Sequence, residues 1–163
     1  MSDLVQLAKR ICIEAHQGQI DKAGEQYSTH PIRVATHASN LARVFFPKLQ
    51  VQEVEAIALL HDVIEDCPEW SASRLVECGI PEALIPFIEA VTKQPEESRS
   101  DYLVRIQNSG TVPIIVKIAD LTDNTDPLRV RKLPKELADR LAGKYDSDLM
   151  TVGQAFARAI LAG

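Results

Sequence analysis

The chain has 163 residues, of which 45% are hydrophobic and 25% are charged, with a formal net charge of −5. These values are typical of a globular protein, and we expect residues 1–163 to form a single domain. The acidic balance disfavours binding to nucleic acid, because neutralising the phosphates requires a basic face. An anionic ligand would therefore need a locally positive pocket.

The cysteine content favours a reducing compartment. Cys12, Cys67 and Cys78 are an odd number of thiols without the paired spacing of a zinc site or a disulfide framework. No apolar run approaches the roughly 20 residues that cross a bilayer, and the N-terminal pattern is amphipathic rather than that of a signal peptide. We therefore expect a cytoplasmic protein without a membrane partner. The sequence leaves its oligomeric state open.

Apolar residues recur at helical spacing along most of the chain, and proline, serine and glycine residues mark the ends of the segments. The predicted helices cover Asp3 to about Gln17, Pro31 to about Phe46, Val51 to about Ile64, Ser71 to Glu77, Pro81 to Thr92, Ser100 to Asn108, Thr111 to Asn124 and Pro134 to about Ile160. A polar loop with two glycines follows the first of them.

The segment TVPIIVKIADL has the β-branched content of a strand. However, Lys117, Asp120 and Asn124 stand at positions i, i+3 and i+7, which share one helical face. We therefore predict a buried helix here, and an all-α helical bundle for the whole chain.

The stretch LLHDVIEDC, Leu59–Cys67, ends an apolar run with four titratable side chains. An isolated His61-Asp62 pair is more often a core histidine beside a solvated aspartate than a ligand pair. Asp120 changes this interpretation, because its neighbours are almost all apolar and an ionised carboxylate there needs a compensating cation. A metal ion is one candidate, and a structural ion pair with Lys117 is the other.

His30 adds a second imidazole. It precedes Pro31, which biases its backbone away from the α region, so we expect its side chain to project from just before a helix. Together with His61, Asp62 and Asp120 it forms a mixed nitrogen and oxygen set. Such a set suits Mn²⁺ or Fe²⁺ with open coordination positions, and an ion of this kind acidifies a bound water that can attack phosphorus.

Glu65 and Asp66 follow Asp62 by three and four residues, so they lie one helical turn further along the same face. A carboxylate in that position can orient or deprotonate an attacking water. The alternative is a solvated acidic helix end, although acids at a helix C-terminus oppose the helix dipole.

The order His30, then His61-Asp62, then Asp120 resembles the HD superfamily of metal-dependent phosphohydrolases. The segments HQGQIDKAGEQYSTHP, LLHDVIED, VTK and VKIADLTDN further resemble successive motifs of the hydrolase domain of RelA/SpoT-type alarmone enzymes, especially the stand-alone small alarmone hydrolases. The resemblance spans about Ala15 to Asn124. It implies an all-helical HD fold, usually with Mn²⁺, that removes the 3′-pyrophosphate of the guanosine alarmone nucleotides ppGpp and pppGpp to leave GDP or GTP.

The resemblance also implies roles for eight residues of this chain. They are metal binding for His30, His61, Asp62 and Asp120, water activation for Glu65 and Asp66, and nucleotide contacts for Lys22 and Asn124. The hydrolase set is intact, which implies an active enzyme rather than a degenerate domain.

Two positions depart from the commonest family pattern. Asp21 stands where long bifunctional enzymes often have arginine, and Leu121 stands where arginine or lysine is frequent. Both changes are expected to remove positive charge near the pocket. Compensating charge can come from a locally basic stretch of the chain. The alternative interpretation is that these residues form a solvated helix face. The members of this stretch are Arg129, Arg131, Lys132, Arg140 and Lys144.

These departures leave the substrate open. A second hypothesis is an HD phosphohydrolase of nucleoside monophosphates or of a ribose-phosphorylated cofactor such as NADPH. A third is a non-catalytic nucleotide sensor with a structural metal, although the Glu65-Asp66 pair speaks against it.

Overall fold

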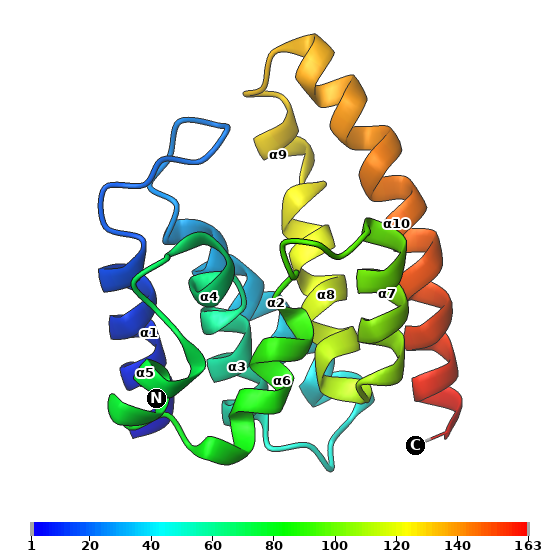
Figure 1. Cartoon of the computed structure of the whole chain (residues 1–163). Helices are drawn as coiled ribbons and strands as arrows, with labels where there is room; N and C mark the ends of the chain where they lie inside the picture. Colours follow the sequence, from blue (N-terminus) through cyan, green and yellow to red (C-terminus); the bar gives the residue numbers. More distant parts are fainter. Residues whose placement is uncertain (1, 163) are drawn as a thin grey trace.

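The structure, a computed structural model, describes residues 2–162, and its regular elements there are helices. In chain order they are α1 (Asp3–Ala15), α2 (Thr29–Phe45), α3 (Val51–Leu60), α4 (Val63–Asp66), α5 (Ala72–Glu77), the 3₁₀ helix η1 (Glu82–Leu84), α6 (Ile85–Val91), α7 (Arg99–Asn108), α8 (Thr111–Asn124), α9 (Pro127–Val130) and α10 (Lys135–Ala162). The predicted all-α fold is confirmed, and TVPIIVKIADL is helical (Figure 1).

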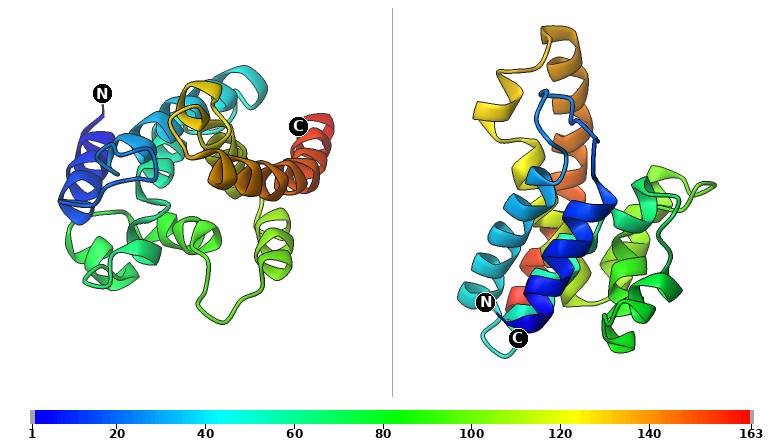
Figure 2. Two further views of the ribbon diagram at one scale, coloured as in Figure 1. Left: turned by 90° about the horizontal axis from the view of Figure 1, so that it is seen from above. Right: turned by 90° about the vertical axis from the view of Figure 1, so that its left-hand side faces the viewer.

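Helix α8 joins two apolar clusters. The larger cluster involves α1, α2, α3, α6 and one side of α8, whereas the smaller one lies between α7, α8 and α10. Ile115 and Val116 of α8 belong to the first cluster, and Leu121 belongs to the second. Figure 2 shows α1 and α10 at opposite sides of the molecule. The loop after α1, the helix α9 and the start of α10 lie together at one end of the molecule, beyond the two apolar clusters (Figure 1).

Helix α2 begins earlier than predicted. The backbone N–H groups of Thr29 and His30 donate to the carbonyls of Gln26 (3.0 Å) and Tyr27 (2.9 Å), so a tight turn leads directly into the helix. Pro31 lies in the first turn, where a missing N–H costs nothing. The prediction that His30 precedes the helix was therefore wrong, because the first turn accommodates both residues.

The predicted helix from Val51 to about Ile64 is interrupted. Helix α3 ends at Leu60, and Asp62 adopts φ −101° and ψ −6° before α4 starts. His61 Nδ1 bonds to the carbonyl of Ala58, 2.8 Å away. This break directs two adjacent side chains to the same space, since His61 Nε2 lies 3.0 Å from Asp62 Oδ2.

Helix α9 was not predicted. The side chain of Asp126 accepts a hydrogen bond from the backbone N–H of Leu128 (2.7 Å), and Pro127 occupies the first helical position. These are ordinary helix-start features, but the helix is only one turn long. Over residues 2–162, no helix is both long and apolar enough to cross a membrane.

Candidate active site

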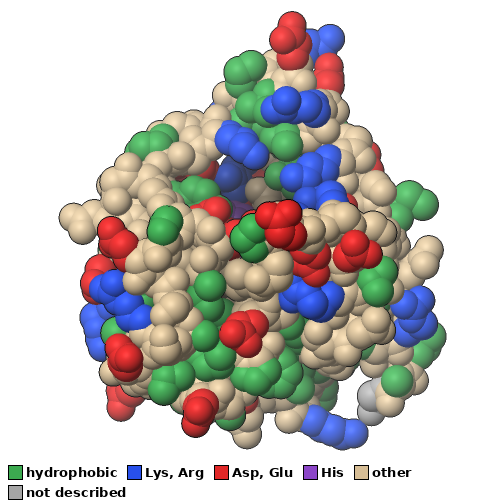
Figure 3. All heavy atoms as spheres, in the orientation of Figure 1, with side chains coloured by type: hydrophobic (Ala, Val, Ile, Leu, Met, Phe, Trp, Pro, Cys, Tyr) green, Lys and Arg blue, Asp and Glu red, His purple; other side chains and the backbone are tan. Residues whose placement is uncertain are grey.

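A cavity of about 370 Å³ opens between the loop after α1, the helices α4, α7, α8 and α9, and the first half of α10. Figure 3 shows this hollow from one face, with a histidine at its base and Lys and Arg side chains around it. The cavity is lined by acidic and basic residues together. A small, highly charged ligand is the kind of molecule that such walls can bind.

The four predicted metal ligands come together at the base of this cavity. His30 Nε2 lies 3.2 Å from Asp120 Oδ1 and 3.7 Å from Asp62 Oδ2. His61 Nε2 lies 3.0 Å from Asp62 Oδ2 and 3.8 Å from Asp120 Oδ1. Ligand atoms of His30, His61 and Asp62 thus lie within 4.8 Å of one another, and Asp120 of α8 approaches this group through its contacts with both imidazoles.

Both imidazoles are held through Nδ1, so that Nε2 faces the other donors. His61 Nδ1 donates to the carbonyl of Ala58 (2.8 Å), and His30 Nδ1 donates to Asp123 Oδ2 (2.7 Å). These two oxygens can only accept, so in the neutral rings they favour the tautomer with the proton on Nδ1 and a lone pair on Nε2. Arg129 Nη1 also lies 3.2 Å from His30 Nδ1. Anchoring of this kind is usual for metal-binding histidines.

Among residues 2–162, two buried side-chain nitrogens, His16 Nε2 and His61 Nε2, lack a hydrogen-bond partner, and the second of them tests whether a metal fits. His61 Nε2 is buried, and its close approach to Asp62 does not have hydrogen-bond geometry. A buried polar atom in that state is costly and calls for a ligand. Two imidazole nitrogens and two carboxylates are a suitable donor set for a divalent ion, so the residues present fit one.

The charges at this point favour a cation. Burial lowers the pKa of His61, but the neighbouring Asp62 and Asp120 outweigh burial and raise that pKa well above its usual value. Burial also opposes ionisation of Asp120, yet Lys117, His30 and His61 hold the pKa of its carboxyl well below the ordinary range. The cluster therefore stabilises positive charge placed between its carboxylates.

Asp120 has partners on both carboxylate oxygens. Lys117 Nζ donates to Oδ2 (2.7 Å), and Asn124 Nδ2 donates to Oδ1 (2.6 Å). The ion pair with Lys117, which the sequence offered as the alternative to a metal, is thus present beside the imidazoles rather than in place of them. Asn124 lines the cavity and orients Asp120.

Two orienting residues escaped the sequence analysis. Tyr27 donates its hydroxyl proton to Asp62 Oδ2 (2.8 Å). Asp123 is fully buried and binds His30 on one side and the guanidinium of Arg33 on the other, with Arg33 Nε 2.7 Å from Oδ1. A second acid three residues after Asp120 in an apolar helix was the available signal, because it also needs compensation.

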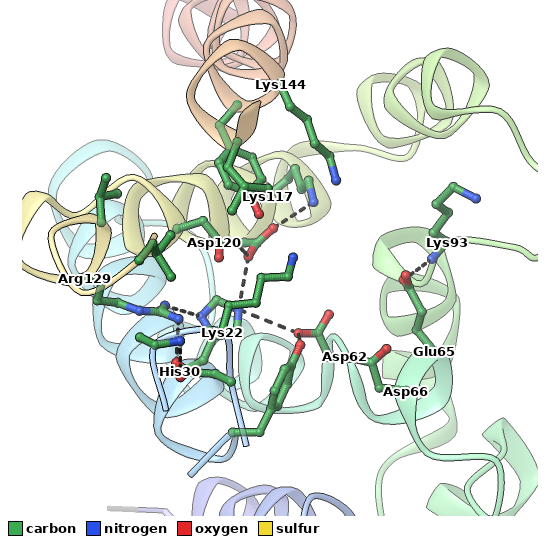
Figure 4. Close-up of a pocket in the computed structure, with 18 of the residues that line it drawn as sticks. Lys22, His30, Asp62, Glu65, Asp66, Lys93, Lys117, Asp120, Arg129 and Lys144 are labelled. Carbon is green, nitrogen blue, oxygen red and sulfur yellow. Dashed lines mark hydrogen bonds and ion pairs between the residues drawn. The ribbon is translucent and has the colours of Figure 1, made fainter. Parts of the chain in front are cut away.

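Glu65 and Asp66 line the same cavity from α4. Glu65 Oε2 accepts a hydrogen bond from the backbone N–H of Lys93, 2.7 Å away, as Figure 4 shows. Burial raises the pKa of Glu65, and the negative charges of Asp62 and Asp66 raise it further. A carboxyl group with a raised pKa is suited to exchanging protons near neutral pH.

The two departures from the family pattern have different structural outcomes. Asp21 lines the cavity, and its Oδ1 accepts the backbone N–H groups of Ala23 and Glu25, both at 2.9 Å, which shapes the loop. Its Oδ2 pairs with Arg129 Nη2 at 2.8 Å, so a cation is retained beside it. Leu121 is fully buried against α7 and α10, and the expected loss of charge at the pocket was wrong for this residue.

The remaining predicted residues lie on the wall and the rim. Lys22 is exposed on the loop after α1 and lines the cavity. From the basic stretch, Arg129 and Lys144 line the cavity, whereas Lys132 pairs with Glu25 on the outside of the loop. Only part of this stretch can therefore meet a bound ligand.

Comparison with known proteins gives consistent matches. A sequence model of the HD domain family matches residues 27–142. The bifunctional (p)ppGpp synthase/hydrolase SpoT of Escherichia coli K12 is 33% identical over 121 residues, which cover 68% of this chain and 16% of the relative. A guanosine-3′,5′-bis(diphosphate) 3′-pyrophosphohydrolase of Haemophilus influenzae is 34% identical over 126 residues, which cover 70% of this chain and 17% of the relative. The chain thus spans about a sixth of the length of these curated relatives.

A solved structure has a similar fold. It is described as a metazoan ortholog of SpoT that hydrolyzes ppGpp and plays a role in starvation responses. The two chains superpose with a TM-score of 0.75 at 20% identity, over 99% of this chain and 92% of that one.

Proposed function

Since the chain belongs to the HD domain family, we propose that it is a metal-dependent phosphohydrolase that removes the 3′-pyrophosphate of ppGpp or pppGpp, giving GDP or GTP and pyrophosphate. The observation that carries this proposal is the convergence of His30, His61, Asp62 and Asp120 at the base of a cavity whose walls carry both cations and carboxylates. The names of the bacterial relatives support the substrate.

In this proposal, His30 and His61 hold the metal through Nε2, and Asp62 and Asp120 hold it through their carboxylates. We propose Mn²⁺, because a mixed set of imidazole and carboxylate donors with open positions suits it. When bound, such an ion acidifies water and stabilises charge on phosphoryl oxygens.

Glu65 accepts the proton of the attacking water in this mechanism. The Lys93 backbone N–H fixes one oxygen of Glu65, 2.7 Å away, so the other oxygen can face the reacting group. Asp66 lies beside it, and burial together with the charge of Asp62 raises the pKa of Asp66. The two carboxyl groups therefore provide a proton acceptor whose affinity for a proton is higher than that of a solvated acid.

Lys22 and Asn124 contact the substrate in this proposal. Lys22 is exposed at the rim, where a flexible ammonium group can follow a phosphate. Asn124 already donates to Asp120 Oδ1 (2.6 Å), and its remaining amide donor or carbonyl can reach a ligand in the cavity.

A substrate panel tests this function. The Mn²⁺-loaded protein is incubated with ppGpp, a nucleoside monophosphate and NADPH at equal concentration, and phosphate and pyrophosphate release are measured. The proposal expects preferential turnover of ppGpp with release of pyrophosphate. Preferred turnover of the nucleoside monophosphate or of NADPH would show that ppGpp is not the substrate. Tight ppGpp binding without release of phosphate or pyrophosphate would indicate a sensor instead of an enzyme.

A further inference from the structure

One arginine of α7 holds the end of α6 and the residue that follows it. The guanidinium of Arg105 has five N–H donors, and all five make hydrogen bonds. Nη1 donates to the carbonyls of Glu89 and Ala90, both at 2.9 Å, and Nη2 donates to the carbonyl of Thr92 at 2.8 Å. Nε and Nη2 also donate to the two carboxylate oxygens of Glu97, each at 2.7 Å. Because the last carbonyls of a helix have no partner within the helix, Arg105 caps α6 from a neighbouring helix.

The peptide group between Thr92 and Lys93 connects Arg105 to the cavity. Its carbonyl accepts the hydrogen bond from Arg105, and its N–H donates to Glu65 Oε2, 2.7 Å away (Figure 4). A trans peptide group is planar, and its carbonyl and N–H point in opposite directions. An arginine that fixes the carbonyl on one side therefore also fixes the direction of the N–H on the other side.

Opposite charges stand at the two ends of this peptide group. The Arg105 cation lies at the carbonyl, and the carboxylate of Glu65 lies at the N–H. Hydrogen bonds to charged groups are stronger than neutral ones, and bonds that follow one another in a chain polarise each other. Thr92 is buried, so without Arg105 its peptide group would turn to find another donor. The Lys93 N–H would then lose its alignment with Glu65.

We propose that Arg105 is a positioning residue for the proton acceptor of the reaction. It orients the peptide group between Thr92 and Lys93, so that the N–H holds one oxygen of Glu65 and leaves the other oxygen facing the attacking water. This inference rests on the proposed function, in which Glu65 accepts the proton of that water. Arg105 lies outside the residues that line the cavity, so its effect on turnover should depend on Glu65.

A double-mutant cycle with a matched control tests this role. Arg105→Met removes the guanidinium and keeps an unbranched side chain. Arg158→Met is the control, because Arg158 is exposed on α10 and its guanidinium donates to Gln107 of α7 (3.3 Å). Steady-state kinetics with ppGpp and Mn²⁺ are measured in the wild type and in the Glu65→Gln background. All assays are run well below the Tm of each variant, since Arg105→Met also removes a helix cap.

We expect Arg105→Met to lower kcat for ppGpp by about tenfold to a hundredfold, because a misplaced base slows turnover. KM should change by no more than about twofold, and Arg158→Met should leave both constants unchanged. In the Glu65→Gln background, Arg105→Met should lower kcat by no more than about a further twofold, since the group that it positions is already inactive. An equal loss in both backgrounds would overturn the inference.

Arg105→Lys is a second variant, for the case in which Arg105→Met does not fold. Its ammonium group keeps the charge but cannot reproduce the planar fork of the guanidinium. We therefore expect kcat to fall in the same Glu65-dependent way. A folded Arg105→Met or Arg105→Lys protein with wild-type kcat would overturn the inference while the proposed function stands.

The amide proton resonance of Lys93 in the metal-stripped protein separates the two proposals, because it requires no turnover. The N–H that donates to Glu65 at 2.7 Å should resonate downfield, and its resonance should move upfield in Arg105→Met and not in Arg158→Met. If this shift is present but the Mn²⁺-loaded wild type does not hydrolyse ppGpp, Arg105 orients the peptide group and the proposed function is wrong. If ppGpp is hydrolysed and the Lys93 resonance is the same in all three proteins, the inference is wrong and the proposed function stands.

Discussion

The base and the rim of the cavity are built in opposite ways. At the base, His30 and Asp120 are buried on helices and His61 is buried in the break between α3 and α4, and each is fixed by at least one further hydrogen bond. At the rim, Lys22 and Lys144 are exposed, and the segment after α9 meets the loop after α1 through the exposed ion pair of Lys132 with Glu25. Buried contacts hold donors in one geometry, whereas exposed ion pairs are weak and screened by salt.

This contrast assigns different tasks to the two regions. Groups that must keep their mutual distances lie where folding itself fixes them. Groups that must admit and release a polyanion lie on a loop and on a helix whose first half projects from the bundle (Figure 1). Changes at the base should therefore affect metal binding and turnover, whereas changes at the rim should affect substrate affinity.

The largest effect is expected from Asp62→Ala at the base. This change removes one carboxylate from the donor set and leaves His61 Nε2 without its nearest neighbour, 3.0 Å away. Mn²⁺ affinity should fall steeply, and ppGpp turnover should fall on the order of a thousandfold or more. Glu53→Gln, a charge change at an exposed position of α3, is the control and should have no effect. A folded Asp62→Ala protein with wild-type turnover would contradict the mechanism.

Glu65→Gln should separate proton transfer from metal binding. The amide keeps the shape of the side chain and can still accept the N–H of Lys93, but it cannot take up a proton. We expect kcat to fall by about 10²- to 10⁴-fold with an unchanged Kd for Mn²⁺. Stopped-assay kinetics and calorimetry on the same preparation measure both quantities, and full activity would remove Glu65 from the role of base.

Asp123→Asn tests the support beneath His30. The neutral amide weakens the charge-assisted bonds from His30 Nδ1 and from Arg33 Nε, each 2.7 Å long. We expect Mn²⁺ affinity to fall by about 10- to 100-fold. Because the change also lowers stability, Kd is measured well below the Tm of the variant. A lower Tm with an unchanged Kd would make Asp123 purely structural.

Lys22→Met is expected to have the smallest effect, and it lies at the rim. The variant should raise KM for ppGpp by about tenfold and leave the Kd for Mn²⁺ unchanged. The kinetic assay at low and high salt adds a check, since the difference from wild type should shrink as salt screens the lost charge. An unchanged KM would exclude Lys22 from substrate binding.

Local sequence signals predicted a helix correctly wherever the signal and the tertiary packing favoured the same structure. The helix from Ser71 starts at a serine cap, as expected, and the buried helix α8 follows from the spacing of Lys117, Asp120 and Asn124. The same spacing places a carboxylate among apolar residues, which is why the base of the cavity could be anticipated. Resemblance to a known family supplied the roles.

Other features depend on contacts that no local pattern contains. Apolar residues stand at helical spacing on both sides of His61 and Asp62. The break between α3 and α4 therefore leaves no signal in the periodicity. The link from Asp123 to His30 joins residues far apart in the chain. The direction of Lys144 depends on how α10 lies across the cavity, because periodicity alone made its position look like an ordinary solvated face.

The most direct measurement follows ppGpp by ion-exchange chromatography of the nucleotide products with metal-stripped protein, before and after Mn²⁺ is added. We predict no change without the ion, and equal amounts of GDP and pyrophosphate after it is added. Intact ppGpp under conditions where Mn²⁺ is shown to bind, or release of phosphate from the 5′ end instead, would contradict the proposal that His30, His61, Asp62 and Asp120 form a 3′-pyrophosphohydrolase centre.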